Sequence, residues 1–127
     1  MMNAPNTQPR TRGFDFVIIQ TRDMMRLRAF YEALLDLRAS VEYQEFYVEY
    51  DLPDGNTFAI GRDPSATEFM PTGGIVFGVD DAAALGKRVV ELGGTYVKRF
   101  GSGEPGACFS EWCTDPDGNV FGLHQRT

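Results

Sequence analysis

The chain has 127 residues, of which 43% are hydrophobic and 13% aromatic, and its formal net charge at pH 7 is −6. This length suits one ordinary domain, and the composition is that of a folded globular protein rather than a disordered chain. The acidic charge argues against a nucleic-acid partner. No apolar run approaches the roughly 20 residues that span a bilayer, so no membrane partner is expected either.

Residues 1–12 are rich in Asn, Pro, Thr, Gln and Arg, and we predict that they form a flexible N-terminal arm. The same segment has no hydrophobic core for export, so a cytoplasmic location is expected. The remainder, 13–127, is predicted to be a single domain. It consists of two modules, over about 13–64 and 72–127, joined by a linker over 65–71.

The first module is predicted to contain a strand, a helix and three further strands. Residues with high strand propensity place its strands at 14–21, 39–43, 45–51 and 57–62. The helix over 24–37 has one apolar face, made of Met24, Leu27, Tyr31, Leu34 and Leu35. Asp23 precedes its first turn, where a carboxylate can accept a free backbone N–H and suits the helix dipole.

The second module is predicted to repeat this order. Its strands are expected at 74–79, 95–100, 107–114 and 120–125. Leu85, Val89 and Leu92 give its helix a buried face. Gly93 and Gly94 end that helix, because glycine adopts the left-handed conformation at little cost.

Two alignments within the chain indicate that the modules are repeats. The turn Pro-Asp-Gly-Asn occurs at 53–56 and again at 116–119, a shift of 63 residues. The strand at 16–20 matches 74–78, a shift of 58, which also places Asp23 on Asp81. Five extra residues in or near the loop 101–106 account for the difference, because loops accept length changes at little cost.

These residues resemble the vicinal oxygen chelate superfamily, which includes glyoxalase I, extradiol dioxygenases, fosfomycin-resistance enzymes and metal-free bleomycin-resistance proteins. The resemblance covers about 13–126. It is carried by Phe30-Tyr31-Glu32-Ala33-Leu34-Leu35-Asp36-Leu37, similar to the Phe-Tyr-x-x-x-Leu-Gly-Leu helix end of the family, and by Asp115-Pro116-Asp117-Gly118-Asn119. It implies an α+β fold with two tandem βαβββ modules that share a curled mixed sheet around an open cleft. A homodimer commonly completes that cleft in the family.

The resemblance also shows where the metal ligands of the family would fall. The histidines of the first strand of each module correspond to Phe16 and Gly74, and the glutamate of the last strand corresponds to Gly122, with Ala59 as its counterpart in the first module. Phenylalanine, alanine and glycine side chains have no metal-donor atom, whereas a divalent metal needs several N, O or S ligands. We therefore expect no bound metal and no other cofactor.

Strand alternation predicts which side chains line the cleft, because successive residues of a strand point to opposite sheet faces. Phe121 and Leu123 are expected to face the helices. Of the cleft residues, the aromatic and apolar ones offer stacking surface, the polar ones orient a ligand, and the small ones leave space. The predicted ligand-binding residues are Phe16, Ile18, Gln20, Tyr47, Glu49, Ala59, Gly74, Ser110, Trp112, Gly122 and His124.

This cleft favours metal-independent binding of a small aromatic or cationic molecule, as in a drug-sequestering protein of the bleomycin-resistance type. Glu49 and the acidic charge suit a cation lying over Trp112. No catalytic residue is assigned on this interpretation.

Two alternatives remain open. One is an enzyme: either a metal-independent, glyoxalase-like lyase or isomerase that would use Glu49 and His124 as acid and base, or a glyoxalase-like metalloenzyme or dioxygenase-related enzyme with a non-standard site. The other is a dimerising regulatory or assembly module whose cleft is filled by its own side chains.

Overall fold

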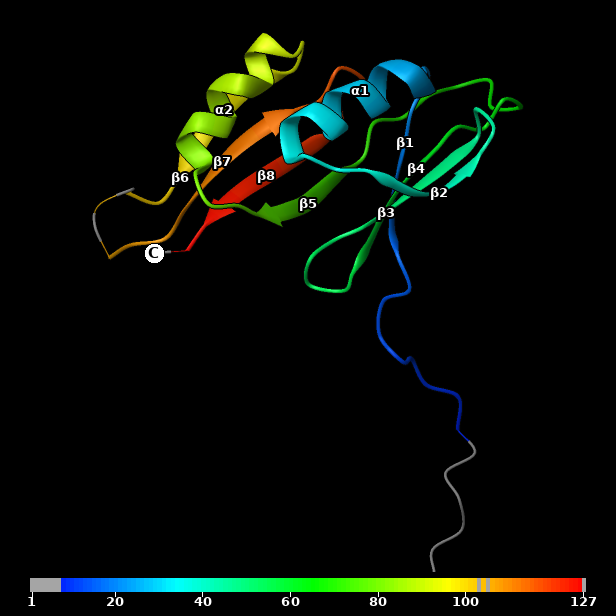
Figure 1. Ribbon diagram of the computed structural model, residues 1–127, viewed down its shortest axis with the longest axis horizontal. Helices are drawn as coiled ribbons and strands as arrows, with labels where there is room; N and C mark the ends of the chain where they lie inside the picture. The colour runs from blue at the N-terminus through cyan, green and yellow to red at the C-terminus, as the bar shows by residue number, and fades with distance from the viewer. Residues whose placement is uncertain (1–7, 103, 105, 127) are drawn as a thin grey trace, which may run out of the picture.

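The computed structural model describes residues 8–102, 104 and 106–126, which form two modules with the same order of elements (Figure 1). The first module contains β1 (Val17–Gln20), α1 (Met24–Leu35), β2 (Ala39–Tyr43), β3 (Tyr47–Asp51) and β4 (Thr57–Gly61). The second contains β5 (Gly73–Gly78), α2 (Ala82–Glu91), β6 (Thr95–Phe100), β7 (Phe109–Thr114) and β8 (Val120–Gln125). The predicted α+β class and the two tandem βαβββ modules are confirmed.

Each module has its own four-stranded sheet, ordered β1-β4-β3-β2 in the first and β5-β8-β7-β6 in the second. In both sheets the first strand of the module runs parallel to the last, and the other neighbours are antiparallel. Among the described residues, no strand of one sheet is hydrogen-bonded to a strand of the other. The fold therefore differs in this respect from the single curled sheet that the resemblance implies.

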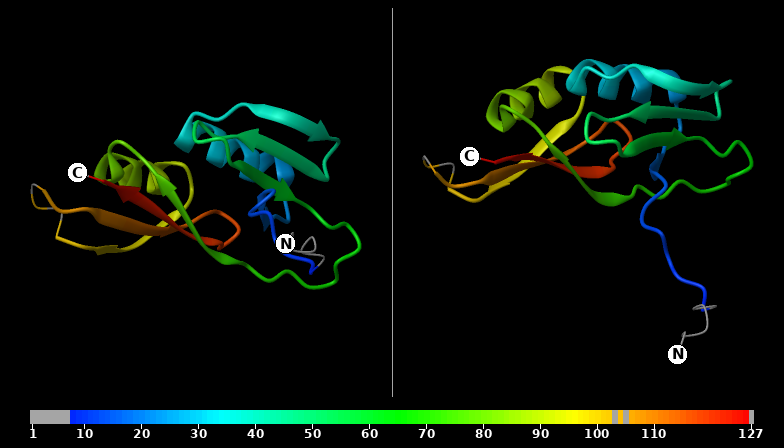
Figure 2. Two further views of the ribbon diagram at one scale, coloured as in Figure 1. Left: turned by 90° about the horizontal axis from the view of Figure 1, so that it is seen from below. Right: turned by 60° about the horizontal axis from the view of Figure 1, so that its bottom comes forward.

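Helix α1 connects the two sheets through the core. Its Tyr31 ring lies 5.2 Å from the Phe58 ring of β4 and 5.6 Å from the Phe121 ring of β8, measured between centroids. The helix is thus packed against both sheets, and both helices lie on the same side of the molecule (Figures 1 and 2). The helix-facing sides of the two sheets share one core, and the opposite sides face outward.

That shared core is rich in aromatic rings. Phe30 and Phe77 join Tyr31, Phe58 and Phe121, with ring centroids 4.9 to 6.3 Å apart and mostly edge-to-face geometry. Such rings bury large apolar areas, and the edge-to-face arrangement adds to the gain from burial. The prediction that Phe121 faces the helices is confirmed, and so is that for Leu123, which is fully buried in the same core.

The buried face of α1 is shifted relative to the face that the sequence predicted. Met24, Leu27, Tyr31 and Leu34 are buried as expected, but Phe30 takes the place of Leu35 as the fifth fully enclosed residue. The cause is that α1 contacts two sheets rather than one. Asp23 caps α1 by accepting the Arg26 backbone N–H at 3.1 Å. Neither helix of the described chain has the length and apolar content needed to cross a membrane.

The second Pro-Asp-Gly-Asn turn locks the two modules together through the buried Asp115 just before it. Its carboxylate accepts hydrogen bonds from the Tyr31 hydroxyl at 2.7 Å, from the backbone N–H groups of Asp117 and Asn119 at 2.9 and 3.0 Å, and from the Asn119 amide at 2.9 Å. Burial raises the pKa of Asp115, while these hydrogen bonds act in the opposite direction. The carboxylate satisfies donors that would otherwise be buried without partners.

The same turn reaches the first module at two more points. Asp117 accepts hydrogen bonds from the Thr21 hydroxyl and from Arg26, at 2.8 Å to the Arg26 guanidinium. Asn119 accepts the Thr72 backbone N–H at 2.9 Å and donates to the Gln20 carbonyl at 3.1 Å. The turn therefore fastens β8 to the end of β1 and to the first turn of α1.

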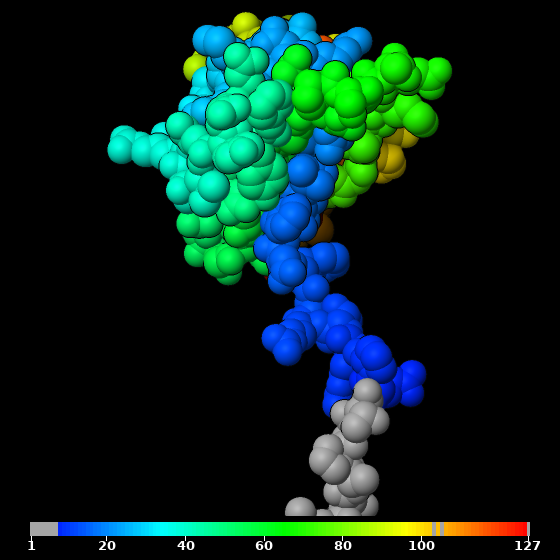
Figure 3. Space-filling view, turned by 90° about the vertical axis from the view of Figure 1, so that its right-hand side faces the viewer, coloured from blue at the N-terminus to red at the C-terminus, as the bar shows by residue number. Residues whose placement is uncertain are grey.

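The N-terminal segment extends away from the body of the protein (Figures 1 and 3). Residues 8–13 are exposed, and Phe14 is 88% exposed. The predicted arm over 1–12 falls partly outside the described residues, since 1–7 are not among them.

Tyr50 provides a test of the packing between α1 and the first sheet. It is fully buried on β3, and its hydroxyl donates to the Glu32 carboxylate of α1 at 2.6 Å. Burial, and secondly this hydrogen bond, raise the pKa of Tyr50 above its usual value of 10.0. Burial likewise raises the pKa of Cys113 to about 11.

We expect the free energy of unfolding to fall as the pH rises above about 10. Below that value Tyr50 is protonated in both states, so its contribution is fully present; above it, the phenol ionises first in the unfolded chain and draws the equilibrium towards unfolding. Urea midpoints measured between pH 7 and pH 11 should show this fall. Tyr50→Phe should flatten the pH dependence, and an unchanged slope in that variant would contradict the assignment.

Candidate functional site

The first half of the candidate site lies on the outward face of the first sheet. Ile18, Ala59 and Glu49 are direct neighbours across β1, β4 and β3, so their side chains share this face, as predicted. Tyr47 lies on the same face, and its ring meets the Phe16 ring edge-on at 6.2 Å between centroids. Gln20 lies on the same face as Tyr47, because both residues pair with Gly61 of β4.

Tyr47 and Glu49 form a polar pair within this apolar surface. The Tyr47 hydroxyl donates to the Glu49 carboxylate at 2.6 Å. Burial, followed by this hydrogen bond, raises the pKa of Tyr47 to about 12, so the phenol stays protonated at physiological pH. The carboxylate keeps further lone pairs with which to accept hydrogen bonds from a ligand.

The second half lies on the outward face of the second sheet and centres on Trp112. Trp112 pairs with Gly122, which pairs with Val76, and Ser110 pairs with His124 in the same register. The indole lies against Gly122, where a Cβ would come within 3.4 Å of two indole carbons. The Phe100 ring meets the indole edge-on at 6.0 Å.

Trp112 is therefore held in place while remaining half-exposed. Gly122 supports it from below and Phe100 supports it from the side, which fixes the orientation of the indole. A fixed and partly exposed indole is a surface on which a planar molecule can stack.

The two halves do not meet within one chain. Their strands belong to different sheets, and both faces point away from the shared core. Phe16 is 46% exposed and Val76 is 45% exposed, consistent with two open surfaces. Glu49 lies on β3 and His124 on β8, so a single chain does not bring this proposed acid–base pair together.

The space predicted above the small residues is only partly present. Gly122 is covered by Trp112 and by Val76, whose Cγ2 would lie 3.2 Å from an added Cβ, and Ala59 is fully buried. Gly74 does have open space beside it, and its φ of +103° lies in an irregular part of β5 where the register shifts. A ligand on this face would consequently lie over the indole rather than on Gly122.

Three further residues on the outward face of the second sheet were not predicted from the sequence: Val76, Lys98 and Phe100. Val76 is the repeat counterpart of the predicted residue Ile18, so the shift of 58 contains the signal that identifies it. Lys98 and Phe100 pair with Trp112 and Ser110, but only after a register shift between Tyr96 and Lys98 that simple alternation does not reveal. The Lys98 ammonium lies 4.5 Å from the centroid of the Phe100 ring.

The family metal does not fit this chain. Phe16, Ala59, Gly74 and Gly122 occupy the positions that would correspond to its ligands, and their side chains supply no donor atom. In the described part of the chain, no group of three or more His, Cys, Asp and Glu side chains is arranged to hold a metal ion.

Comparison with known proteins agrees with this architecture. Residues 16–124 match the family model of the glyoxalase-like domain. Comparison with curated proteins gave no significant match.

Several solved structures share the fold. A glyoxalase/bleomycin resistance protein from Albidiferax ferrireducens T118 is 22% identical with a TM-score of 0.72, covering 90% of this chain and 98% of its own. The fosfomycin resistance protein FosX from Mesorhizobium loti is 23% identical with a TM-score of 0.64, covering 93% and 95%. A lactoylglutathione lyase from Agrobacterium tumefaciens is 14% identical with a TM-score of 0.67, covering 91% and 94%. With its two βαβββ modules and this match over most of its length, the chain belongs to the glyoxalase-like domain family of the vicinal oxygen chelate superfamily.

Proposed function

We propose that the protein binds a small aromatic molecule, preferably one carrying a positive charge, without a metal and without catalysis. The observation that carries this proposal is the half-exposed indole of Trp112, fixed between Gly122 and Phe100 on an open sheet face. A rigid aromatic surface of this kind favours stacking of a planar ligand. The donor-free residues at the positions of the family's metal ligands support a role in binding rather than in metal-assisted chemistry.

We further propose that the complete site forms between two copies of the chain. Each chain exposes two incomplete surfaces, one around Tyr47 and Glu49 and the other around Trp112. Exposed apolar side chains on both, such as Phe16, Ile18 and Val76, would be covered when the first sheet of one chain faces the second sheet of another. In that arrangement the Glu49 carboxylate lies opposite the indole.

This arrangement assigns the two chemical parts of the ligand to different chains. The aromatic part stacks on Trp112, where the nearby Lys98 ammonium makes the surface unsuitable for a second cation. The cationic part points to Glu49, whose carboxylate already accepts a hydrogen bond from Tyr47. We accordingly propose a drug-sequestering role of the bleomycin-resistance type, with the ligand class set by these two contacts.

The fluorescence of Trp112 tests the proposal at a single position, because it is the only tryptophan in the chain, provided that the absorption of the dye is corrected for. Titration with planar aromatic dyes that carry an alkylammonium side chain should quench this fluorescence to saturation. The same titration with excess EDTA should give the same affinity. Absence of saturable quenching across the set would contradict the proposal, and loss of binding in EDTA would contradict its metal independence.

A further inference from the structure

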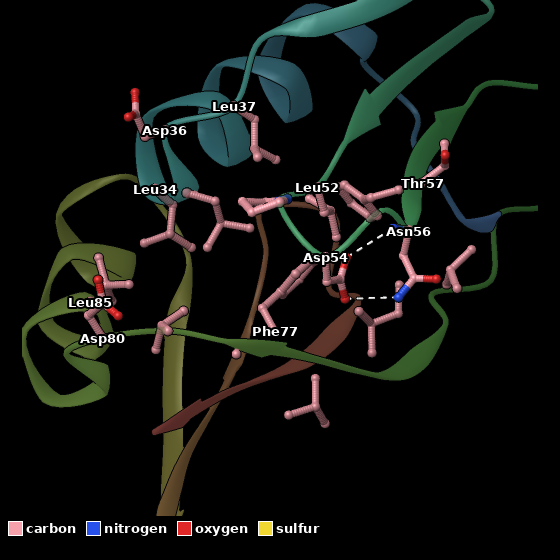
Figure 4. A pocket seen from close by; sticks show the side chains of 18 of the residues that line it. Leu34, Asp36, Leu37, Leu52, Asp54, Asn56, Thr57, Phe77, Asp80 and Leu85 are labelled. Atoms are coloured by element: carbon pink, nitrogen blue, oxygen red, sulfur yellow. Dashed lines mark hydrogen bonds between the residues drawn. The ribbon is translucent and has the colours of Figure 1, made fainter. Parts of the chain in front are cut away.

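A cavity lies between the two modules, and Phe16 and Val76 at the edges of the two sheet faces described above are among the residues that line it. It has a volume of about 960 Å³ and is bordered by the end of α1, the first Pro-Asp-Gly-Asn turn, β5 and the start of α2. We call it the junction groove (Figure 4). Leu34, Phe58 and Phe77 form its floor, and Leu52 and Leu85 stand at its sides.

The groove exists because the two repeated turns behave differently. In the second module, Asp115 and Asp117 bind Tyr31, Thr21 and Arg26 and close the junction at the other end of β1. In the first module, the shift of 63 places Leu52 and Asp54 at the positions of Asp115 and Asp117. The shift of 58 places Val89, Val79 and Ala84 at the positions of their partners Tyr31, Thr21 and Arg26. None of the partners that hold the second turn is reproduced.

The first turn therefore stays at a distance from the second module. Asp54 accepts hydrogen bonds from the backbone N–H and the amide of Asn56 within its own turn, at 3.0 and 2.8 Å. The position that corresponds to Arg22 is Asp80, so the charge facing Asp54 across the groove is negative instead of positive. The junction is left open over an apolar floor.

The charges around the groove all have the same sign. Within the described chain, every charged residue that borders it is an aspartate, namely Asp15, Asp36, Asp54, Asp80 and Asp81. Figure 4 shows Asp36, Asp54 and Asp80 around the apolar side chains of both modules. An apolar floor within a negative rim has the chemistry that complements a molecule with an apolar body and a cationic head.

We propose that the junction groove binds a cationic amphiphile, a small molecule with an alkyl or aryl body and an ammonium or guanidinium head. The body covers Leu34, Phe58 and Phe77, and the head lies at the acidic rim to which Asp54 and Asp80 belong. The groove and the Trp112 surface share an edge at Val76, but they have different centres, because Trp112 does not border the groove. It does not depend on the function proposed above.

Isothermal titration calorimetry with decyltrimethylammonium, below its micelle concentration, tests the site. We expect saturable binding that weakens at high salt, and no comparable binding of decyl sulfate, which has the same tail and the opposite charge. Shortening the tail by two methylenes should weaken binding on the order of tenfold, because each buried methylene contributes about 0.8 kcal/mol. Equal binding of both detergents, or an affinity independent of tail length, would overturn the assignment.

Variants locate the binding. Asp54→Asn/Asp80→Asn should weaken the binding of decyltrimethylammonium about tenfold, as expected for the loss of two partly screened charge contacts. Asp63→Asn/Glu45→Gln removes the same charge outside the groove and should leave the affinity unchanged. Trp112→Leu should also bind the probe normally. If Trp112→Leu alone abolishes binding, the probe is on the sheet face and the groove assignment is wrong.

The N-terminal arm of a second copy is the competing occupant. Arg10 and Arg12 are exposed on this arm, which joins the domain next to Phe14, a residue that lines the groove. The full-length variant Arg10→Glu/Arg12→Glu distinguishes the two occupants. Equal probe affinity in this variant and in the wild type supports the small-molecule site, whereas binding that appears only in the variant assigns the groove to the arm.

Discussion

Replacing Asp115 by alanine is expected to lower the free energy of unfolding by about 3–5 kcal/mol. The substitution removes the acceptor of the Tyr31 hydroxyl, of two backbone N–H groups and of the Asn119 amide, all in a buried region. Each donor left without a partner in the interior carries a desolvation cost. Urea denaturation at pH 7, followed by far-UV circular dichroism, would measure the change.

The first turn provides a matched control for this prediction. Asp54→Ala removes an aspartate from the same Pro-Asp-Gly-Asn tetrapeptide, but Asp54 is exposed and binds only within its own turn in the contacts described above. Its loss should destabilise the protein far less than the loss of Asp115, as for an ordinary surface position. Equal destabilisation by Asp115→Ala and Asp54→Ala would show that the junction network does not stabilise the fold.

Replacing Trp112 by leucine is expected to weaken the binding of a planar aromatic cation by about 10- to 100-fold, with little loss of stability. The indole supplies the stacking surface, whereas a leucine side chain at this position would still cover Gly122 but offer no flat face. Because this variant has no tryptophan, its affinity must be measured by the fluorescence of the dye or by calorimetry.

Two comparisons make this second prediction specific. Val97→Leu changes another exposed apolar residue of the same sheet and should leave the affinity unchanged. Glu49→Gln should weaken binding of the cationic dyes but not of a neutral analogue, because only the cation uses the carboxylate charge. Unchanged affinity in Trp112→Leu would remove the observation on which the proposed function rests.

Local patterns predicted the elements and the repeat correctly. The helix and strand periodicities lie within short segments, so α1 and all eight strands appear close to their expected bounds, and α2 appears between β5 and β6 as predicted. Counting from the two Pro-Asp-Gly-Asn turns also predicted the faces of Tyr47, Glu49, Ser110 and Trp112, since strand alternation propagates from a fixed turn.

Long-range packing was harder to predict. The burial of Phe30 follows from the packing of α1 against both sheets, and neither this packing nor the division into two sheets is specified by a local pattern. Asp115 was recognised only as part of a turn, because its partner Tyr31 lies 84 residues away in the sequence. Lys98 and Phe100 were missed because a register shift reverses the alternation in β6.

The two turns have the same sequence but different surroundings. The tetrapeptides are identical, yet one turn joins the modules and the other leaves a groove, because their partners lie elsewhere in the chain. The sequence does contain this information, in the replacement of Thr21 and Arg22 by Val79 and Asp80 at the matching positions. Repeats are therefore informative where their surroundings differ, and not only where they agree.

The central claim is that one ligand site takes Trp112 from one chain and Glu49 from another, and mixing two defective variants tests it most directly. Each variant by itself, Trp112→Leu or Glu49→Arg, should bind the cationic dye at least tenfold more weakly than the wild type, so that neither binds it appreciably at a dye concentration near the wild-type Kd. After co-refolding in equal amounts, half of the dimers are mixed and each mixed dimer has one intact site, so about a quarter of wild-type binding should return. No recovery in a mixture that sedimentation shows to contain mixed dimers would contradict a site shared between chains.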